Sequence, residues 1–166
     1  QTTEISVMMS YLQIIDNPHQ DIPLAAVLRS PLYNVDENGL ALIRAQQDHS
    51  DYFEAVAYFA SQPLEKLEQA GLSAAQVLRL QATVQRFMDD LTAFHQLAVQ
   101  NQIVDLIWQI YNRTGWLDYV GGLPAGAQRQ ANLHALYQRA ARYQRSSFVG
   151  LYQFINYVNE LEKQDR

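Results

Sequence analysis

The chain has 166 residues, of which 48% are hydrophobic, and a formal net charge of −5. This length and apolar content predict a single globular domain, residues 1–166, and exclude a disordered chain. The chain has no cysteine, which excludes disulfides and thiolate metal sites. No apolar run approaches the roughly 18 residues of a membrane span, and the first residues lack the pattern of a signal peptide. We therefore expect a cytoplasmic protein with no membrane partner.

The charge is unevenly distributed along the chain. Residues 1–118 contain 14 acids and 6 bases, a balance of −8, whereas residues 119–159 contain four arginines and no acid. The acidic total therefore conceals one basic region, and a nucleic-acid partner for that region is not excluded by net charge.

Apolar residues recur at helical spacing almost throughout, which predicts an all-α fold, an irregular multi-helix bundle of about seven to nine helices. The first helix is expected over residues 3–16. Pro23 is expected at the first position of a short second helix that ends near residue 30. Asn34 with Glu37 is expected to cap a third helix, and Asp51 with Glu54 a fourth.

The second half begins with the strongest local signal. Gly71 is expected to end a short turn region, and Ser73 with Gln76 predicts a capping box for one long helix near residues 74–99. Residues 103–111 are apolar nearly all round, which predicts a central buried helix. The glycine-rich residues 121–126 are expected to form a flexible loop before a helix over about 127–143. A last helix is expected to carry Phe148, Leu151, Ile155, Val158 and Leu161.

Catalytic machinery is not indicated. A phosphate-binding loop needs a glycine-rich turn that ends in Gly-Lys-Ser or Gly-Lys-Thr, and the sequence has none. A metal-dependent helical-bundle enzyme needs Glu-x-x-His on two helices, which is also missing. The histidines are scattered and are expected to be surface or capping residues; they are His19, His49, His95 and His134. We therefore expect no catalytic, cofactor-binding or metal-binding residue in this chain.

The basic region offers one candidate binding surface. Arg139, Arg142 and Arg145 recur every third residue, so they fall along one side of a helix and could follow DNA phosphates. A merely solvated basic face is the alternative, and the spacing does not separate the two. The tyrosines and tryptophans could stack on bases, but their helical spacing favours a place in the core.

Two stretches of the chain, which follow in the same order, resemble one protein family. The first is residues 11–31, YLQIIDNPHQDIPLAAVLRSP; the second is DLIWQIY at residues 105–111, followed by TG at 114–115, DYVGGLP at 118–124 and QRQANL at 128–133. These stretches closely resemble AddA (RexA), a component of the ATP-dependent helicase/nuclease of Gram-positive bacteria, which is related to UvrD-type superfamily 1 helicases. Order and spacing hold across the whole chain.

The resemblance implies a function and a set of partners. In such helicases this stretch is similar to the helical 2B insertion of the second motor domain. The resemblance implies a non-catalytic accessory domain that holds duplex DNA near the fork, positions the motor, or docks neighbouring domains or the partner subunit. ATP and Mg²⁺ binding, 3′–5′ helicase activity and exonuclease activity are then expected elsewhere in a parent chain that processes double-strand breaks for recombinational repair. The expected partners are duplex or forked DNA, the remaining domains of the parent helicase and an AddB/RexB-type subunit. The start at Gln1 without methionine fits a piece of a longer chain.

One difference from UvrD-type relatives affects the expected DNA contacts. Those relatives carry a Gly-Ile-Gly turn where this chain has Asn34, Val35 and Asp36, and Asp36 adds a charge that repels phosphate. The candidate DNA contacts are Arg29, Asn34, Arg129, Arg139, Arg142 and Arg145. The alternative function is a free-standing helical protein–protein interaction module.

Overall fold

The computed structural model describes residues 1–146 and 150–164, and over these ranges it contains nine α-helices and no strand. The first half comprises α1 (Thr3–Asp16), α2 (Asp21–Arg29), α3 (Glu37–Gln46), α4 (Tyr52–Ser61), the 3-10 turn η1 (Leu64–Lys66) and α5 (Ala74–Val99). The second half comprises α6 (Ile103–Arg113), α7 (Trp116–Gly121), α8 (Gly126–Ser146) and α9 (Leu151–Gln164). The all-α prediction and the long helix at residues 74–99 are confirmed.

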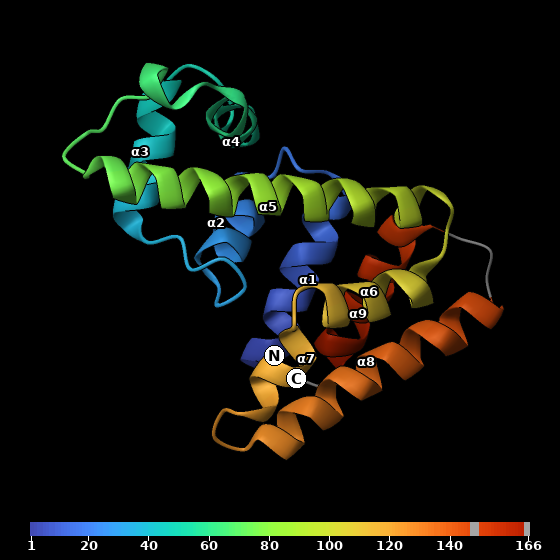
Figure 1. The fold of residues 1–166 in the computed structure, drawn as a ribbon. Coiled ribbons are helices and arrows are strands. Elements are labelled where there is room, and N and C mark those ends of the chain that lie inside the picture. The colour runs from blue at the N-terminus through green and yellow to red at the C-terminus, as the bar shows by residue number, and fades with distance from the viewer. Residues whose placement is uncertain (147–149, 165–166) are drawn as a thin grey trace.

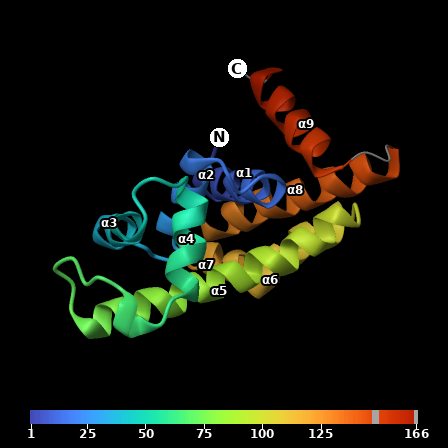
Figure 2. The same ribbon diagram turned by 90° about the horizontal axis from the view of Figure 1, so that it is seen from above.

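The helices are arranged around α1. In Figure 1, α5 runs along one side of the molecule and α8 along the opposite side, with α1 between them. The first helix contacts α2, α5, α8 and α9, and so joins the two halves of the chain. Figure 2 shows α3 and α4 beside the first half of α5, and α4 contacts both α3 and α5. None of the described helices is both long enough and apolar enough to span a membrane.

The central place of α1 follows from its sequence, because it buries apolar side chains on more than one side. Its buried hydrophobic residues are Met8, Met9, Tyr11, Leu12, Ile14 and Ile15. Around it, polar atoms of other buried side chains find backbone partners: the Tyr111 hydroxyl donates to the Leu133 carbonyl at 2.6 Å, and the Trp116 indole donates to the Glu4 carbonyl at 3.3 Å. These bonds connect α6 to α8 and α7 to α1.

The helix starts confirm two predicted caps and correct two other predictions. Asp51 accepts from the Glu54 amide, and Ser73 with Gln76 forms the full capping box. Helix α3, however, is capped by Asp36, whose carboxylate accepts from the Gly39 amide, and not by Asn34. Asn34 instead takes a left-handed conformation, with φ of 53°, in the turn before the cap.

The predicted position of Pro23 is also corrected. Helix α2 begins at Asp21, so Pro23 is its third residue and not its first. A proline is still tolerated there, because amides in the first turn of a helix have no intrahelical acceptor to lose.

Helix α6 differs from the predicted all-round buried helix. Its buried residues are Ile103, Leu106, Ile107, Ile110 and Tyr111, which lie on one side. The prediction of a wholly buried helix was wrong because Trp108 is 41% exposed, with its ring packed against Tyr137, and Asp105 and Gln109 share the outer side. The most central helix is α1.

Residues 121–126 form a close turn between α7 and α8. The Gly122 amide donates to the Tyr119 carbonyl, and the Arg129 amide donates to the Ala125 carbonyl. A methyl group at Gly126 would lie 2.1 Å from the Gly121 carbonyl oxygen, so the two chain segments meet at van der Waals contact. The expected flexible loop is therefore a compact connection. The last helix carries Leu151, Ile155 and Val158, which are buried, and Leu161, which is half-buried, whereas Phe148 lies outside the described residues.

Candidate nucleic-acid interface

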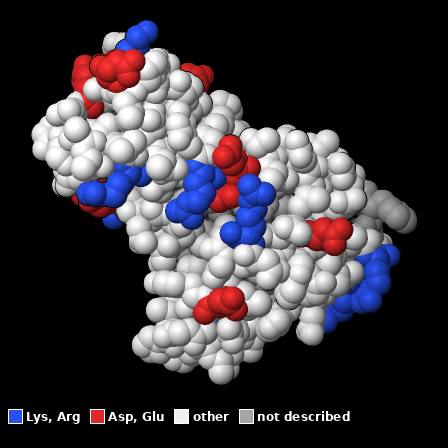
Figure 3. Space-filling view, viewed as in Figure 1, with Lys and Arg blue, Asp and Glu red and all other residues white. Residues whose placement is uncertain are grey.

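Helix α8 carries the basic surface that the sequence indicated. It contains four arginines and no acid along Gly126–Ser146. Arg142 and Arg145 are exposed, whereas Arg139 is half-buried and lines a hollow of about 540 Å³ that Glu162 of α9 also lines. Figure 3 shows basic side chains gathered over the end of α8 that lies far from α7. We call Arg139, Arg142 and Arg145 the α8 surface, and its freely accessible members are the last two.

Arg129 has a structural partner. Its Nη1 donates to Glu4 Oε1 at 2.8 Å, its Nε donates to the Pro124 carbonyl at 2.9 Å, and Asn132 Nδ2 donates to the second oxygen of Glu4 at 2.9 Å. Glu4 is only 1% exposed. Burial acts to raise the pKa of Glu4, but hydrogen bonds from the side chains of Thr2, Asn132 and Arg129 and from the backbone hold this pKa below its ordinary value. The guanidinium of Arg129 is therefore committed to keeping a buried carboxylate ionised.

Arg29 and Asn34 lie at a turn between α2 and α3, remote from the far end of α8 (Figure 1). Arg29 ends α2 and pairs with the exposed Glu37 at 3.3 Å. The structure thus separates the predicted contacts into three places: the turn after α2, the Glu4 pair at the start of α8, and the α8 surface.

The backbone of that turn has few donors left for a phosphate. The amides of Tyr33 and Asn34 both donate to the Ser30 carbonyl, and the Val35 amide donates to the Leu28 carbonyl at 2.9 Å. Any anion held at this turn must therefore be bound by side chains and not by a ring of open amides.

A buried polar network beside the turn was missed from the sequence. The Tyr33 hydroxyl donates to Asp90 Oδ2 at 2.7 Å, and Arg113 Nε donates to Asp90 Oδ1 at 2.7 Å. The Arg86 guanidinium lies over the Tyr33 ring, 5.0 Å from its centroid. Burial, the contact with Tyr11 and the charge of Asp90 all raise the pKa of Tyr33, so its hydroxyl stays protonated and can donate. Sequence separations of 57 and 23 residues left no local signal for this network.

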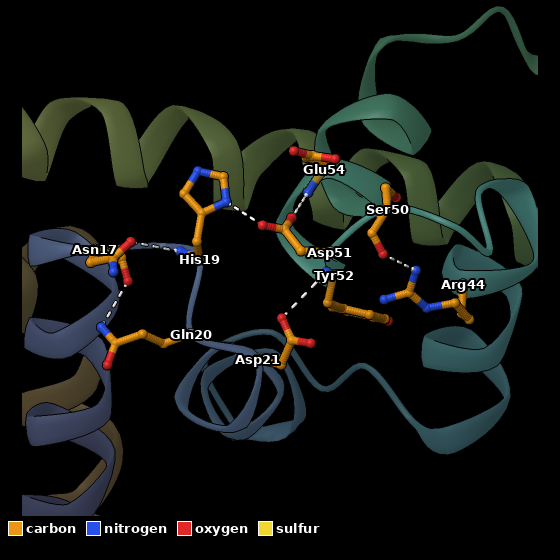
Figure 4. A network of polar contacts seen from close by, with 9 residues as sticks. All are labelled: Asn17, His19, Gln20, Asp21, Arg44, Ser50, Asp51, Tyr52 and Glu54. Carbon is orange, nitrogen blue, oxygen red and sulfur yellow. Dashed lines mark hydrogen bonds and ion pairs between the residues drawn. The ribbon is translucent and has the colours of Figure 1, made fainter.

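A second polar network joins the link between α1 and α2 to the start of α4 (Figure 4). His19 Nδ1 contacts Asp51 Oδ2, while Asp51 Oδ1 accepts from the Glu54 amide at 2.9 Å. One ligand atom from each of His19, Asp51 and Glu54 lies within 4.8 Å of the others. Both Asp51 oxygens already have partners, so these contacts hold the link between α1 and α2 against the start of α4. The expectation of no metal site stays a prediction.

The aromatic side chains divide between core and surface. Trp116 and Tyr111 are buried, as helical spacing indicated. Tyr143 stacks on Tyr157 with ring centroids 4.8 Å apart, and Tyr157 keeps an exposed edge together with Tyr152. Trp108 is also exposed, and Tyr137 and Tyr143 are half-buried. The expectation that most of these rings belong to the core is therefore correct for Trp116 and Tyr111 and wrong for Trp108, Tyr152 and Tyr157.

The matches to known proteins cover the whole chain. The chain is 52% identical over 167 residues to the A subunit of the ATP-dependent helicase/nuclease of Lactiplantibacillus plantarum, covering all of this chain and 13% of that protein. It is 52% identical over 166 residues to the protein of the same name from Latilactobacillus sakei, covering 18% of it, and 51% identical over 161 residues to that from Oenococcus oeni, covering 13%. No family model matches the chain. The chain spans less than a fifth of the length of these relatives. Over its whole length it is therefore homologous to one region of the AddA family of ATP-dependent helicase/nuclease proteins.

Proposed function

We propose that this chain is a non-catalytic accessory domain of a bacterial ATP-dependent DNA helicase/nuclease, and that it positions duplex DNA for the motor. The observation that carries the proposal is the α8 surface, in which Arg142 and Arg145 are exposed on a helix that has no acidic residue. The chain that carries this surface is 52% identical to part of such an enzyme. Arginine suits this role because its planar guanidinium binds phosphate oxygens with two parallel hydrogen bonds.

The relatives' name supports an ATP-dependent helicase/nuclease as the parent enzyme, and the finer setting is proposed from the family resemblance. Helicase and nuclease activity, with ATP and Mg²⁺ as cofactors, would reside outside these residues, in a cytoplasmic enzyme that processes double-strand breaks for recombinational repair. The proposed location in that enzyme is the 2B insertion of the second motor domain. Its neighbours would be the remaining domains of the parent helicase and an AddB/RexB-type subunit.

The test uses the full-length enzyme and a forked DNA duplex. Binding is measured from 50 to 200 mM KCl for the wild type and for Arg142→Ala/Arg145→Ala. Loss of two phosphate contacts should reduce the slope of log affinity against log salt by about 1.8, and adding Arg139→Ala should raise this reduction to at most about 2.7. Lys66→Glu is the matched control, because it also changes the charge by two but lies on η1, at the far end of the molecule.

An unchanged slope for the double variant would refute the DNA role of the α8 surface. If the same variant instead lost association with the AddB/RexB-type subunit, the α8 surface would be a docking site. That outcome would keep the role of an accessory domain and replace DNA positioning with subunit docking.

A further inference from the structure

Helix α6 leaves a tryptophan on the surface of the molecule. Trp108 is 41% exposed, whereas the other apolar side chains of this helix are buried or half-buried. Its ring packs against Tyr137 of α8, with the ring centroids 5.6 Å apart, so the indole is already held in one place. Tryptophan is enriched among the few residues that contribute most of the binding energy at protein interfaces. An exposed and ordered tryptophan is therefore a candidate centre for a docking surface.

Trp108 borders a hollow between α5 and α6. The hollow has a volume of about 250 Å³, and α5 lines it with the half-buried Leu97 and the buried Phe94. Gln109 and Asp105 line it from α6. In Figure 3 the surface over α6 is mostly uncharged. An apolar side chain from another protein segment could therefore enter the hollow while its neighbours contact the indole.

The charges around the hollow favour a basic partner. Asp105 is exposed and forms no ion pair within the described residues. Arg113 also lines the hollow, but its charge is matched by the buried Asp90 at 2.7 Å, and the exposed Asp89 lies close to it. Asp105 precedes Trp108 by three residues, so the carboxylate and the indole share one side of α6. Together they suit a lysine or arginine side chain, which would pair with the carboxylate and lie over the indole.

The length of the relatives favours a partner within the same polypeptide. The chain spans 13% and 18% of the relatives from Lactiplantibacillus plantarum and Latilactobacillus sakei, so more than four-fifths of each relative lies outside the matched region. A domain joined through the same polypeptide meets this surface at a high effective concentration, so a contact of modest area is sufficient. Interfaces between domains of one chain are also more polar than permanent subunit interfaces, which suits a surface that combines an indole with a carboxylate and an amide.

We propose that Asp105, Trp108 and Gln109, here called the α6 surface, dock a basic side chain and an adjoining apolar side chain from another domain of the parent polypeptide. The inference rests on the proposed function only in placing the chain as one domain of a larger enzyme. Because Trp108 packs on Tyr137 of α8, docking at the α6 surface also fixes the position of the helix that carries the α8 surface.

The test uses photo-cross-linking in the full-length enzyme. The photoreactive amino acid p-benzoylphenylalanine replaces Gln109, which leaves Asp105 and Trp108 in place. Irradiation should join position 109 to a residue of another domain, found by mass spectrometry, without a product of higher mass on a denaturing gel. The yield should fall about threefold between 50 and 500 mM KCl, because salt screens the ion pair with Asp105. The same amino acid in place of Gln153, an exposed glutamine of α9, is the matched control and should not reach the same peptide.

Two substitutions test the roles of the indole and the carboxylate. Trp108→Ala should lower the cross-link yield at 50 mM KCl about tenfold, as expected for a residue at the centre of an interface. Asp105→Asn should lower it about threefold and remove most of its dependence on salt. Asp118→Asn removes an exposed carboxylate from α7 and should change neither the yield nor its salt dependence. Asp105 is itself exposed, so its substitution tests docking without unfolding the chain.

The outcomes separate this inference from the proposed function. A product of higher mass, in which position 109 is joined to a partner subunit or to a second copy, would overturn the assignment to the parent polypeptide. Cross-links confined to residues 1–166, or a yield unchanged by both Trp108→Ala and Asp105→Asn, would overturn the α6 surface as a docking site. The DNA role is judged separately, by the salt slope of Arg142→Ala/Arg145→Ala. An unchanged slope together with the expected cross-link would refute DNA positioning and leave docking at the α6 surface established.

Discussion

The guanidinium of Arg129 lies 2.8 Å from the carboxylate of Glu4 and joins the start of α8 to the start of α1 across 125 positions of sequence. Glu4 is buried, so the pair replaces water as the partner of its charge. This ion pair and Asn132 beside it therefore help to fix the start of the basic helix on the central helix, together with the buried apolar side chains of α8.

Breaking this pair should be costly for stability. Arg129→Met leaves a buried carboxylate with Asn132 as its remaining side-chain donor on α8, and the free energy of unfolding should fall by roughly 2–3 kcal/mol. This loss is smaller than the roughly 3–5 kcal/mol typical of a fully buried ion pair, because the Arg129 side chain is 30% exposed. Urea unfolding of the chain measures the change. Arg142→Met, on the exposed side of the same helix, should change it by less than about 0.5 kcal/mol.

The double variant Glu4→Gln/Arg129→Met removes both charges and should recover part of the lost free energy of unfolding. If Arg129→Met alone were as stable as the wild type, Arg129 would have no structural role and would again be a candidate DNA contact.

Acid should remove the stabilisation that Glu4 provides. Its pKa is lowered in the folded chain relative to its ordinary value of 4.5. A lowered folded-state pKa means that the contribution is fully present above about pH 4.5 and is lost as the pH falls through the folded-state value. The stability difference between wild type and Glu4→Gln should thus be constant from pH 7 to about pH 5.5 and shrink below about pH 4.5.

Urea midpoints between about pH 3.5 and pH 7 test this expectation. Asp51, whose pKa is lowered mainly by the Glu54 amide, titrates in both proteins and so cancels in the difference. A difference that grows toward acid would show that the sign assigned to Glu4 is wrong.

Gln81 should stabilise the contact between α4 and α5. It is 6% exposed, and its Nε2 donates to the Phe59 carbonyl at 3.0 Å and to the Gln62 carbonyl at 2.7 Å. Gln81→Ala leaves these carbonyls at the C-terminal end of α4 without that donor, which should cost about 1–3 kcal/mol. Gln96, further along the same helix, is exposed, so Gln96→Ala is the matched control. Equal melting temperatures for the two variants would exclude this capping role.

The sequence predicted the features that depend on neighbouring residues. The caps at Asp51 and Ser73 are predictable because donor and acceptor lie three residues apart. The bounds of α5 follow from that capping box and an unbroken apolar pattern. The prediction of Asn34 in place of Asp36 as the cap of α3 was wrong because both are good capping residues, and the chain geometry before the helix decides between them.

Long-range pairings could not be predicted from local patterns. The spacing of Arg139, Arg142 and Arg145 placed them on one side of a helix, but nothing in that spacing distinguishes a free arginine from one with a buried partner. Arg129 has Glu4 as its partner, 125 residues away. The Arg86 guanidinium likewise packs on Tyr33, which belongs to a distant segment of the chain.

The contact between Gly126 and Gly121 bears on where the basic side chains point. Helix α8 begins at Gly126, and Arg142 lies about 24 Å further along its axis. The start of the helix has no room for a methyl group at Gly126, since that methyl would lie 2.1 Å from the Gly121 oxygen. If α8 tilted by about 10° at this end, Arg142 would move by about 4 Å, which is more than the length of a hydrogen bond. The direction of the arginines thus depends in part on a residue at the opposite end of their helix, where glycine has a hydrogen atom in place of a side chain.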